Sequence, residues 1–97
     1  MNNQMITVNV SGHLKDFTGK KRQFEVPGSA INNVIDLIEY LNRLFPGIKE
    51  RILDDQDITR QYVNIFVNGE NIRSSEKEST KLKEGDKVHI LPSVAGG

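Results

Sequence analysis

The spacing of apolar residues changes twice along this chain of 97 residues, and this change constrains the fold more than any other feature. Residues 6–11 alternate apolar and polar side chains, which is the period of two that a half-buried strand requires. From residue 31 the apolar side chains recur at helical spacing, as Ile31, Val34, Ile35, Ile38, Leu41 and Phe45. Alternation returns at residues 87–91 around Val88 and Ile90. The pattern therefore predicts strands on either side of one amphipathic helix of about four turns.

Two further strand regions are indicated by their composition and turn residues. Residues 23–26 alternate around Phe24 and Val26 and are expected to form an N-terminal hairpin with the first strand. Residues 60–72 are rich in side chains that favour strands, and they contain Asn68-Gly69, the preferred dipeptide for a tight hairpin turn. Ile72 is accordingly expected to continue the returning strand.

The ends of the helix and of the last strand are marked by short polar or rigid residues. Ser29 is the candidate N-cap of the helix, although no Glu or Gln follows it at the capping-box position. Pro46-Gly47 is expected to end the helix. Pro92 has no N–H group, so strand pairing is expected to stop there.

Together these elements follow the order strand, strand, helix, strand, short strand, strand, which is the ubiquitin-like β-grasp order. The sequence thus predicts an α+β domain over residues 1–92, with a mixed sheet of four to five strands packed on one main helix. Residues 93–97 are small and have no strand or helix period. They are expected to form a flexible C-terminal tail.

Charge and composition exclude several functional classes. The formal net charge is zero, so the chain lacks the positive field on which non-specific nucleic-acid binding depends. It contains no cysteine, which excludes disulfides, thiolate metal sites and cysteine nucleophiles. No apolar run approaches the roughly 20 residues needed to cross a bilayer, and the N-terminus has no signal-peptide pattern. We expect a cytoplasmic protein that is monomeric when free and has no membrane or nucleic-acid partner.

Most other polar residues are predicted to have ordinary structural roles. His13 and His89 have no second ligand at metal-binding spacing, so no metal site is expected. The acidic residues at 54, 55 and 57 lack the glycine and downstream Glu of a calcium loop and are interpreted as a polar loop. The basic run Lys20-Lys21-Arg22 is interpreted as a solvated hairpin edge, with docking of acidic partners as the alternative.

The stretch VNGENIRSSEKESTKLKEGDKVHILPSVAGG, residues 67–97, resembles the C-terminal third of the ubiquitin-like sulfur carriers of the MoaD, CysO and ThiS type. In that family a strand and turn like residues 67–73 lead to a turn like residues 82–86. A strand like residues 88–92 then delivers a terminal Gly-Gly pair. The resemblance extends to the first strand and to the helix ending in FPG, so it covers nearly the whole chain.

The resemblance implies that the Gly97 carboxylate is the working group. A partner adenylating enzyme would use ATP to form an acyl-adenylate at Gly97, and sulfur would then displace AMP to give a thiocarboxylate. Gly96 and Ala95 would thread into the partner's active site, because a thin chain end without side chains near its reacting carbonyl can enter a narrow channel. A sulfur-accepting synthase would take the sulfur. The chain itself would bind no cofactor and would not be an enzyme, although it could be the small subunit of a synthase such as molybdopterin synthase.

Partner docking is predicted to involve Phe66, Pro92 and Val94. Phe66 lies on one face of its predicted strand and Val63, Ile65 and Val67 on the other, so both faces are apolar while the helix can bury only one. Either loops cover the second face or it is exposed for a partner. In the related carriers the open sheet face and the tail dock together on partner enzymes.

Two questions stay open at the level of sequence. Residues 60–73 look more like the carriers for cysteine biosynthesis than like the small subunit of molybdopterin synthase, which leaves both pathways in view. The competing hypotheses are a ubiquitin-like modifier joined through Gly97 to lysines of target proteins, and a β-grasp interaction domain whose tail is inert.

Overall fold

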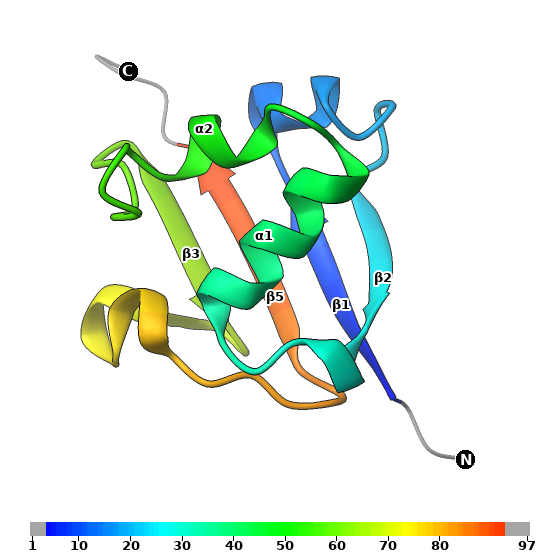
Figure 1. Cartoon of the computed structure of the whole chain (residues 1–97), viewed down its shortest axis with the longest axis vertical. Coiled ribbons are helices and arrows are strands. Elements are labelled where there is room, and N and C mark those ends of the chain that lie inside the picture. The colour runs from blue at the N-terminus through cyan, green and yellow to red at the C-terminus, as the bar shows by residue number, and fades with distance from the viewer. Residues whose placement is uncertain (1–3, 93–97) are drawn as a thin grey trace.

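A five-stranded mixed sheet forms the base of the molecule, with the spatial order β2-β1-β5-β3-β4 (Figure 1). The computed structural model describes residues 4–92. The strands are β1 (Met5–Val10), β2 (Gln23–Pro27), β3 (Val63–Val67), β4 (Glu70–Asn71) and β5 (Lys87–Pro92). β1 pairs antiparallel with β2 and parallel with β5, and β3 pairs antiparallel with β5 and β4. This is the mixed sheet that the sequence predicted, and β5 is its central strand.

Two α-helices pack on one face of this sheet, the face toward the viewer in Figure 1. They are α1 (Val34–Leu44) and α2 (Ile48–Ile52). Four short 3-10 helices complete the described chain: η1 (Gly12–Asp16), η2 (Gly28–Ala30), η3 (Ile72–Ser74) and η4 (Lys77–Ser79). The alternating residues of the strands that face the helices are buried, as predicted: Ile6, Val8, Val10, Val63, Ile65, Val88 and Ile90. The core therefore lies between the helices and this face of the sheet.

The start of α1 differs from the prediction. Ile31 is buried but extended, with φ −128° and ψ 113°, and the helix has 11 residues, about three turns. Ser29 lies in η2 and is not its cap. Asn33 caps the helix instead, because its Oδ1 accepts a hydrogen bond from the Asp36 amide at 2.8 Å. Asp36 Oδ2 in turn accepts from the Asn32 amide at 3.0 Å, so a reciprocal cap of the capping-box kind fixes this boundary.

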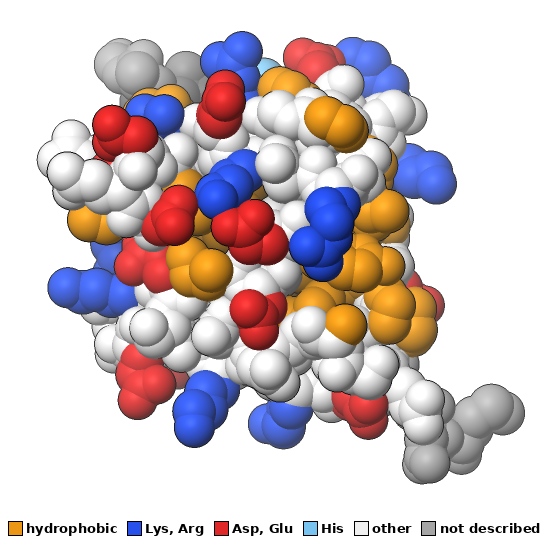
Figure 2. Space-filling model, viewed as in Figure 1, with side chains coloured by type: hydrophobic (Ala, Val, Ile, Leu, Met, Phe, Trp, Pro, Cys, Tyr) orange, Lys and Arg blue, Asp and Glu red, His pale blue; other side chains and the backbone are white. Residues whose placement is uncertain are grey.

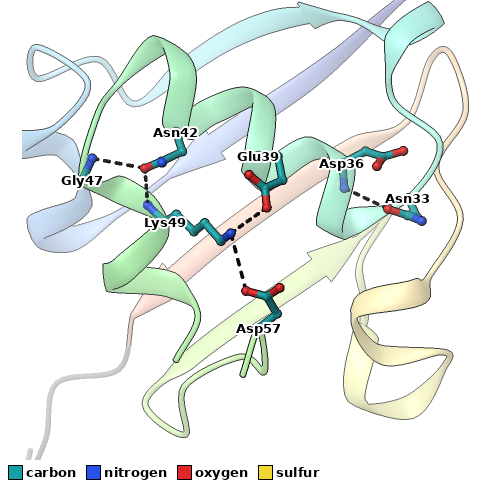
Figure 3. A network of polar contacts seen from close by, with 7 residues as sticks. All are labelled: Asn33, Asp36, Glu39, Asn42, Gly47, Lys49 and Asp57. Carbon is teal, nitrogen blue, oxygen red and sulfur yellow. Dashed lines mark hydrogen bonds and ion pairs between the residues drawn. The ribbon is translucent and has the colours of Figure 1, made fainter. Parts of the chain in front are cut away.

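A second helix, α2, follows Pro46-Gly47 and was not predicted. Asn42 Oδ1, near the end of α1, accepts hydrogen bonds from the Gly47 and Lys49 amides, both at 3.1 Å. Lys49 Nζ lies 2.6 Å from Glu39 Oε2 on α1 and 3.5 Å from Asp57 Oδ1 in the following loop (Figure 3). The hydrogen bond to Glu39 raises the pKa of Lys49. Polar contacts thus join α1, α2 and the acidic loop.

The β3–β4 hairpin contains a further departure from the prediction. Asn68 and Gly69 form the tight turn, both with positive φ, 51° and 88°, as the Asn-Gly dipeptide predicted. The returning strand β4 has only two residues, and Ile72 begins η3 rather than extending it. Ile72 is buried, so its apolar character reflects core packing rather than strand pairing. Tyr62 lies in a turn before β3.

No helix within residues 4–92 is long and apolar enough to span a membrane.

Candidate functional site

The carboxyl end of β5 is the last part of the chain that the structure describes, and it pairs with β1 as far as Ile90 and with β3 as far as Pro92. Val10 of β1 lies opposite Ile90, and Asn64 of β3 lies opposite Leu91. The pairing continues to the last described residue, where Val63 is the partner of Pro92. β5 therefore includes Pro92, one residue further than the sequence predicted. A proline is tolerated at this position because its nitrogen faces the β1 side, where strand pairing ends at Ile90, so no ladder hydrogen bond is lost.

The register of β5 is also fixed at its beginning. Asp86, which is 5% exposed, precedes the strand and accepts hydrogen bonds from the Asn68 side-chain amide at 2.9 Å and the Lys83 amide at 2.9 Å. Asn68 Oδ1 accepts from the Lys87 amide at 3.0 Å. The hairpin turn between β3 and β4 is thereby tied to the first residue of β5. A strand held in register at its beginning places its far end at a defined point.

Gly12, at the start of η1, packs against the carboxyl end of β5. It has φ +62°, and a Cβ atom built on it would lie 3.1 Å from Pro92 Cγ. The Ser11 amide donates a hydrogen bond to the Ile90 carbonyl at 3.2 Å. The start of η1 thus packs directly against the last described residue of β5, and glycine is the residue that suits both this backbone conformation and this close approach.

The sheet face opposite the helices presents Phe66 and Leu91 beside this exit. Their strands are neighbours, with Phe66 opposite His89 and Leu91 opposite Asn64. Phe66 and Leu91 are therefore diagonal neighbours on one face. Both are half-buried, so part of each apolar side chain remains accessible. We call the face formed by Asn64, Phe66, His89 and Leu91 the open face.

Polar contacts frame the open face on two sides. Arg73 Nη1 donates to Asn64 Oδ1 at 2.8 Å, and Arg73 Nη2 donates to the Arg60 carbonyl at 3.0 Å. On the other side Ser11 Oγ and His89 Nε2 form a hydrogen-bonded pair 2.9 Å apart. The result is a small apolar centre with a guanidinium at one border and an imidazole at the other.

Of the residues that the sequence indicated for docking, the structure places Phe66 on the open face, opposite His89, and Pro92 at the end of β5, opposite Val63. Their role in docking stays a prediction. Val94, Ala95, Gly96 and Gly97 lie outside the described residues, and the domain boundary after residue 92 likewise stays a prediction. Residues 4–92 contain no group of His, Asp or Glu side chains arranged to hold a metal ion.

Sequence reasoning missed Leu91, Arg73 and Gly12. The alternation of the last strand carried a signal for Leu91, because it shares parity with Lys87 and His89. Arg73 and Gly12 had no such signal, since their contacts with Asn64 and Pro92 depend on how distant segments pair.

The fold and the exit geometry together define a ubiquitin-like β-grasp protein. Residues 8–97 match the model of the ThiS family. The sulfur carrier protein CysO of Mycobacterium tuberculosis is 35% identical over 94 residues, which are 95% of this chain and 98% of that protein. The chain belongs to the ThiS family, and its relatives support a sulfur-carrier or ubiquitin-like role.

Solved structures give the same assignment. The Amycolatopsis orientalis BexX/CysO complex contains a chain of TM-score 0.83 and 33% identity, with coverage of 95% of this chain and 99% of that one. The small archaeal modifier protein 1 of Methanosarcina acetivorans has a TM-score of 0.79 and 31% identity, with 96% of each chain covered. This chain is thus similar both to sulfur carriers and to a protein modifier.

Proposed function

We propose that this chain is a sulfur carrier whose Gly97 carboxylate is adenylated by a partner enzyme and converted to a thiocarboxylate. The observation that carries the proposal is the fixed end of β5. Pairing with β1 and β3, and the packing of Gly12 on Pro92, give the segment after Pro92 a defined origin beside the open face. Family membership, together with relatives that are sulfur carriers, supports the same reading.

The chemistry requires little of the carrier except a reachable carboxylate. A terminal carboxyl group has a pKa of about 3.5 in short peptides, so it is ionised at neutral pH. Its oxygen attacks the α-phosphorus of ATP, and pyrophosphate leaves. A sulfur nucleophile then attacks the acyl carbon of this mixed anhydride, and AMP leaves, which gives the thiocarboxylate. Gly96 and Ala95 place no bulky side chain near the reacting carbon.

The open face supplies the docking surface in this proposal. Phe66 and Leu91 provide apolar contact, and Arg73 is placed to meet an acidic group of the partner at the border. An enzyme that binds this face would orient the carrier so that residues 93–97 enter its active site. The binding energy of docking would then hold the Gly97 carboxylate in place against ATP, and holding two reactants in the right geometry lowers the activation barrier of their reaction substantially.

For the sulfur acceptor we favour a synthase of the cysteine-biosynthesis type. The resemblance of residues 60–73 to those carriers supports this choice, and the relatives named CysO agree with it. The molybdopterin-type acceptor is the alternative, and the two are separated by supplying each acceptor enzyme with the thiocarboxylate form and measuring product.

The proposal is tested by ATP–pyrophosphate exchange with the adenylating enzyme of the same cell. Deletion of Gly97 is expected to abolish exchange that depends on the carrier. Phe66→Ser is expected to lower it about tenfold at limiting carrier, which corresponds to roughly one apolar side chain lost from an interface. Leu44→Ser is the matched control, because Leu44 is 49% exposed on the helical side of the molecule. Exchange that is undiminished without Gly97 would overturn the proposal.

A second candidate function, conjugation through Gly97 to lysines of target proteins, is favoured by the similarity to the small archaeal modifier protein 1. Both functions share the adenylation step and differ in product. Species of increased mass that contain this chain joined to other proteins would support the modifier, whereas free thiocarboxylate supports the carrier.

A further inference from the structure

β2 is an edge strand with an unpaired side. Its one strand neighbour within residues 4–92 is β1. The Arg22 carbonyl accepts a hydrogen bond from the Val10 amide at 2.8 Å, and the Gly28 amide donates to the Gln4 carbonyl at 2.9 Å. Backbone groups alternate in direction along an antiparallel strand, so residues of even number face β1. The N–H and C=O groups of Gln23 and Glu25 therefore point away from the sheet, where another strand can pair with them.

An apolar strip lies between this edge and α1. Glu39 and Asn42 contact Lys49 and Gly47 on the α2 side of α1, so the flank that carries Tyr40 and Leu44 faces the other way, toward β2. Phe24 of β2 meets Phe45, which follows α1, in an edge-to-face contact with ring centroids 5.4 Å apart. Figure 2 shows hydrophobic side chains gathered here, at the right of the view. We call Phe24, Tyr40, Leu44 and Phe45 the α1–β2 strip.

Unpaired positive charge lies at one end of the α1–β2 strip. Lys21 and Arg22 directly precede β2 and are exposed, and the Arg43 guanidinium lies over the Tyr40 ring, 5.8 Å from its centroid. None of these three side chains has an ion-pair partner among residues 4–92, whereas Lys20 is paired with Asp16 at 2.7 Å. Near the other end of the α1–β2 strip, the Asp36 carboxylate accepts a hydrogen bond from the Asn32 amide. The strip therefore has a basic end beside Arg22 and a neutral to acidic end at the start of α1.

We propose that the β2 edge and the α1–β2 strip form a binding site for an extended, acidic segment of a partner protein, which adds as a strand beside β2. The backbone of Gln23 and Glu25 would pair with the segment, as in other recognition by strand addition. Alternate aliphatic side chains of the segment would pack on Phe24 and Leu44. Its Asp or Glu residues would lie beside Lys21, Arg22 and Arg43, so the acidic end of the bound segment would lie at the start of β2. Pro27 has no N–H, so the paired stretch is short.

This site is separate from the open face. The strip lies on the helical side of the sheet at the β2 edge, whereas Phe66 and Leu91 lie on the opposite side of the sheet in the central strands. A partner bound at β2 therefore leaves residues 64–66 and the end of β5 accessible. Adenylation at Gly97 and binding at β2 can occur on one carrier molecule.

The test is NMR titration of the isotope-labelled full chain with two short synthetic peptides, each with alternating valine and threonine and a run of glutamates at one end or the other. One of the two peptides is expected to shift the amide signals of Gln23, Glu25 and Leu44 and to slow hydrogen exchange at Gln23 and Glu25. The same peptide with lysines in place of glutamates is expected to bind about tenfold more weakly. Added salt is expected to reduce the difference between them.

Two variants and one control sharpen the result. Leu44→Ser is expected to weaken binding about fivefold, and the double change Lys21→Glu with Arg22→Glu about tenfold. Phe66→Ser, on the open face, is expected to leave peptide affinity unchanged. All four positions are at least partly exposed, and thermal melting of each variant verifies folding.

Three outcomes would overturn the proposal: no shift with either acidic peptide, shifts centred on Asn64, Phe66 and Leu91, or equal binding of the lysine peptide. Concentration-dependent shifts at Gln23 and Glu25 without peptide would assign the edge to a second copy of this chain instead and would also overturn it. Each of these results leaves the proposed adenylation of Gly97 untouched, because that proposal is measured by pyrophosphate exchange.

Discussion

Replacing Gly12 with alanine tests how the end of β5 is held. The left-handed backbone at φ +62° costs an L-residue about 1–2 kcal/mol, and alanine recovers about 0.4–1 kcal/mol by restricting the unfolded chain. The new Cβ would also lie 3.1 Å from Pro92 Cγ, so η1 or Pro92 must shift by a few tenths of an ångström. Overpacking of this kind adds about 1 kcal/mol at the lower end of its usual range. We expect Gly12→Ala to destabilise the protein by about 2 kcal/mol in total.

Gly19 offers a matched control within the chain. It has φ +65°, but a Cβ atom there would meet nothing within 4 Å. Gly19→Ala therefore carries the backbone cost alone, about 1 kcal/mol, or roughly 5 °C in melting temperature, against roughly 10 °C for Gly12→Ala. Thermal denaturation followed by circular dichroism measures both.

Pyrophosphate exchange distinguishes a specific role of Gly12 from general destabilisation of the protein. At a temperature where both variants are fully folded, Gly12→Ala is expected to slow pyrophosphate exchange and Gly19→Ala is not, because only the former displaces Pro92. Equal melting temperatures and equal exchange rates for the two variants would refute the argument that Gly12 positions the chain exit.

Three further changes test the account of the fold. Asn33→Ala removes the cap of α1 and is expected to cost about 1 kcal/mol in urea unfolding, while Ser29→Ala should change stability by less than about 0.5 kcal/mol; the reverse order would contradict the assigned cap. Burial raises the pKa of Glu78, but hydrogen bonds from the Thr59 amide and hydroxyl, each 2.7 Å, outweigh it and leave the pKa below its usual range. Ionised Glu78 therefore stabilises the folded state above its unfolded pKa, and this stabilisation is lost as the pH falls through its folded pKa. Glu78→Gln is expected to reduce the loss of stability measured in a series of unfolding experiments toward acid pH. An unchanged dependence of stability on pH in this variant would disprove the linkage. Leu37→Ala opens space in the core and is expected to cost about 2–5 kcal/mol by chemical denaturation, whereas a cost below about 1 kcal/mol would show that Leu37 is not packed as described.

Strand pairing near strong local signals could be predicted from the sequence. The Asn68-Gly69 turn fixed the β3–β4 hairpin, and alternation around Val88 and Ile90 identified β5 and its buried face. The errors arose where tertiary packing used apolar residues outside the regular elements. Ile31 has helical spacing relative to Val34 but is buried in an extended segment, and α2 has too few residues to show a period.

The candidate site was predictable only in part, for a related reason. Phe66 follows from alternation within one strand, which a single sequence displays. The contact of Gly12 with Pro92 joins residues far apart in sequence, and so does the hydrogen bond from Arg73 to Asn64. Such contacts depend on strand order and register, which periodicity alone does not specify.

The central claim is that Gly97 carries sulfur, and the mass of the chain tests it most directly. The protein is purified from its own cell without reducing or acidic treatment, and its intact mass and C-terminal peptide are measured. The account predicts a fraction of molecules in which sulfur replaces one oxygen of the Gly97 carboxylate, and this fraction should disappear when the adenylating enzyme is removed. An unmodified carboxylate in every molecule, with and without that enzyme, would contradict the account.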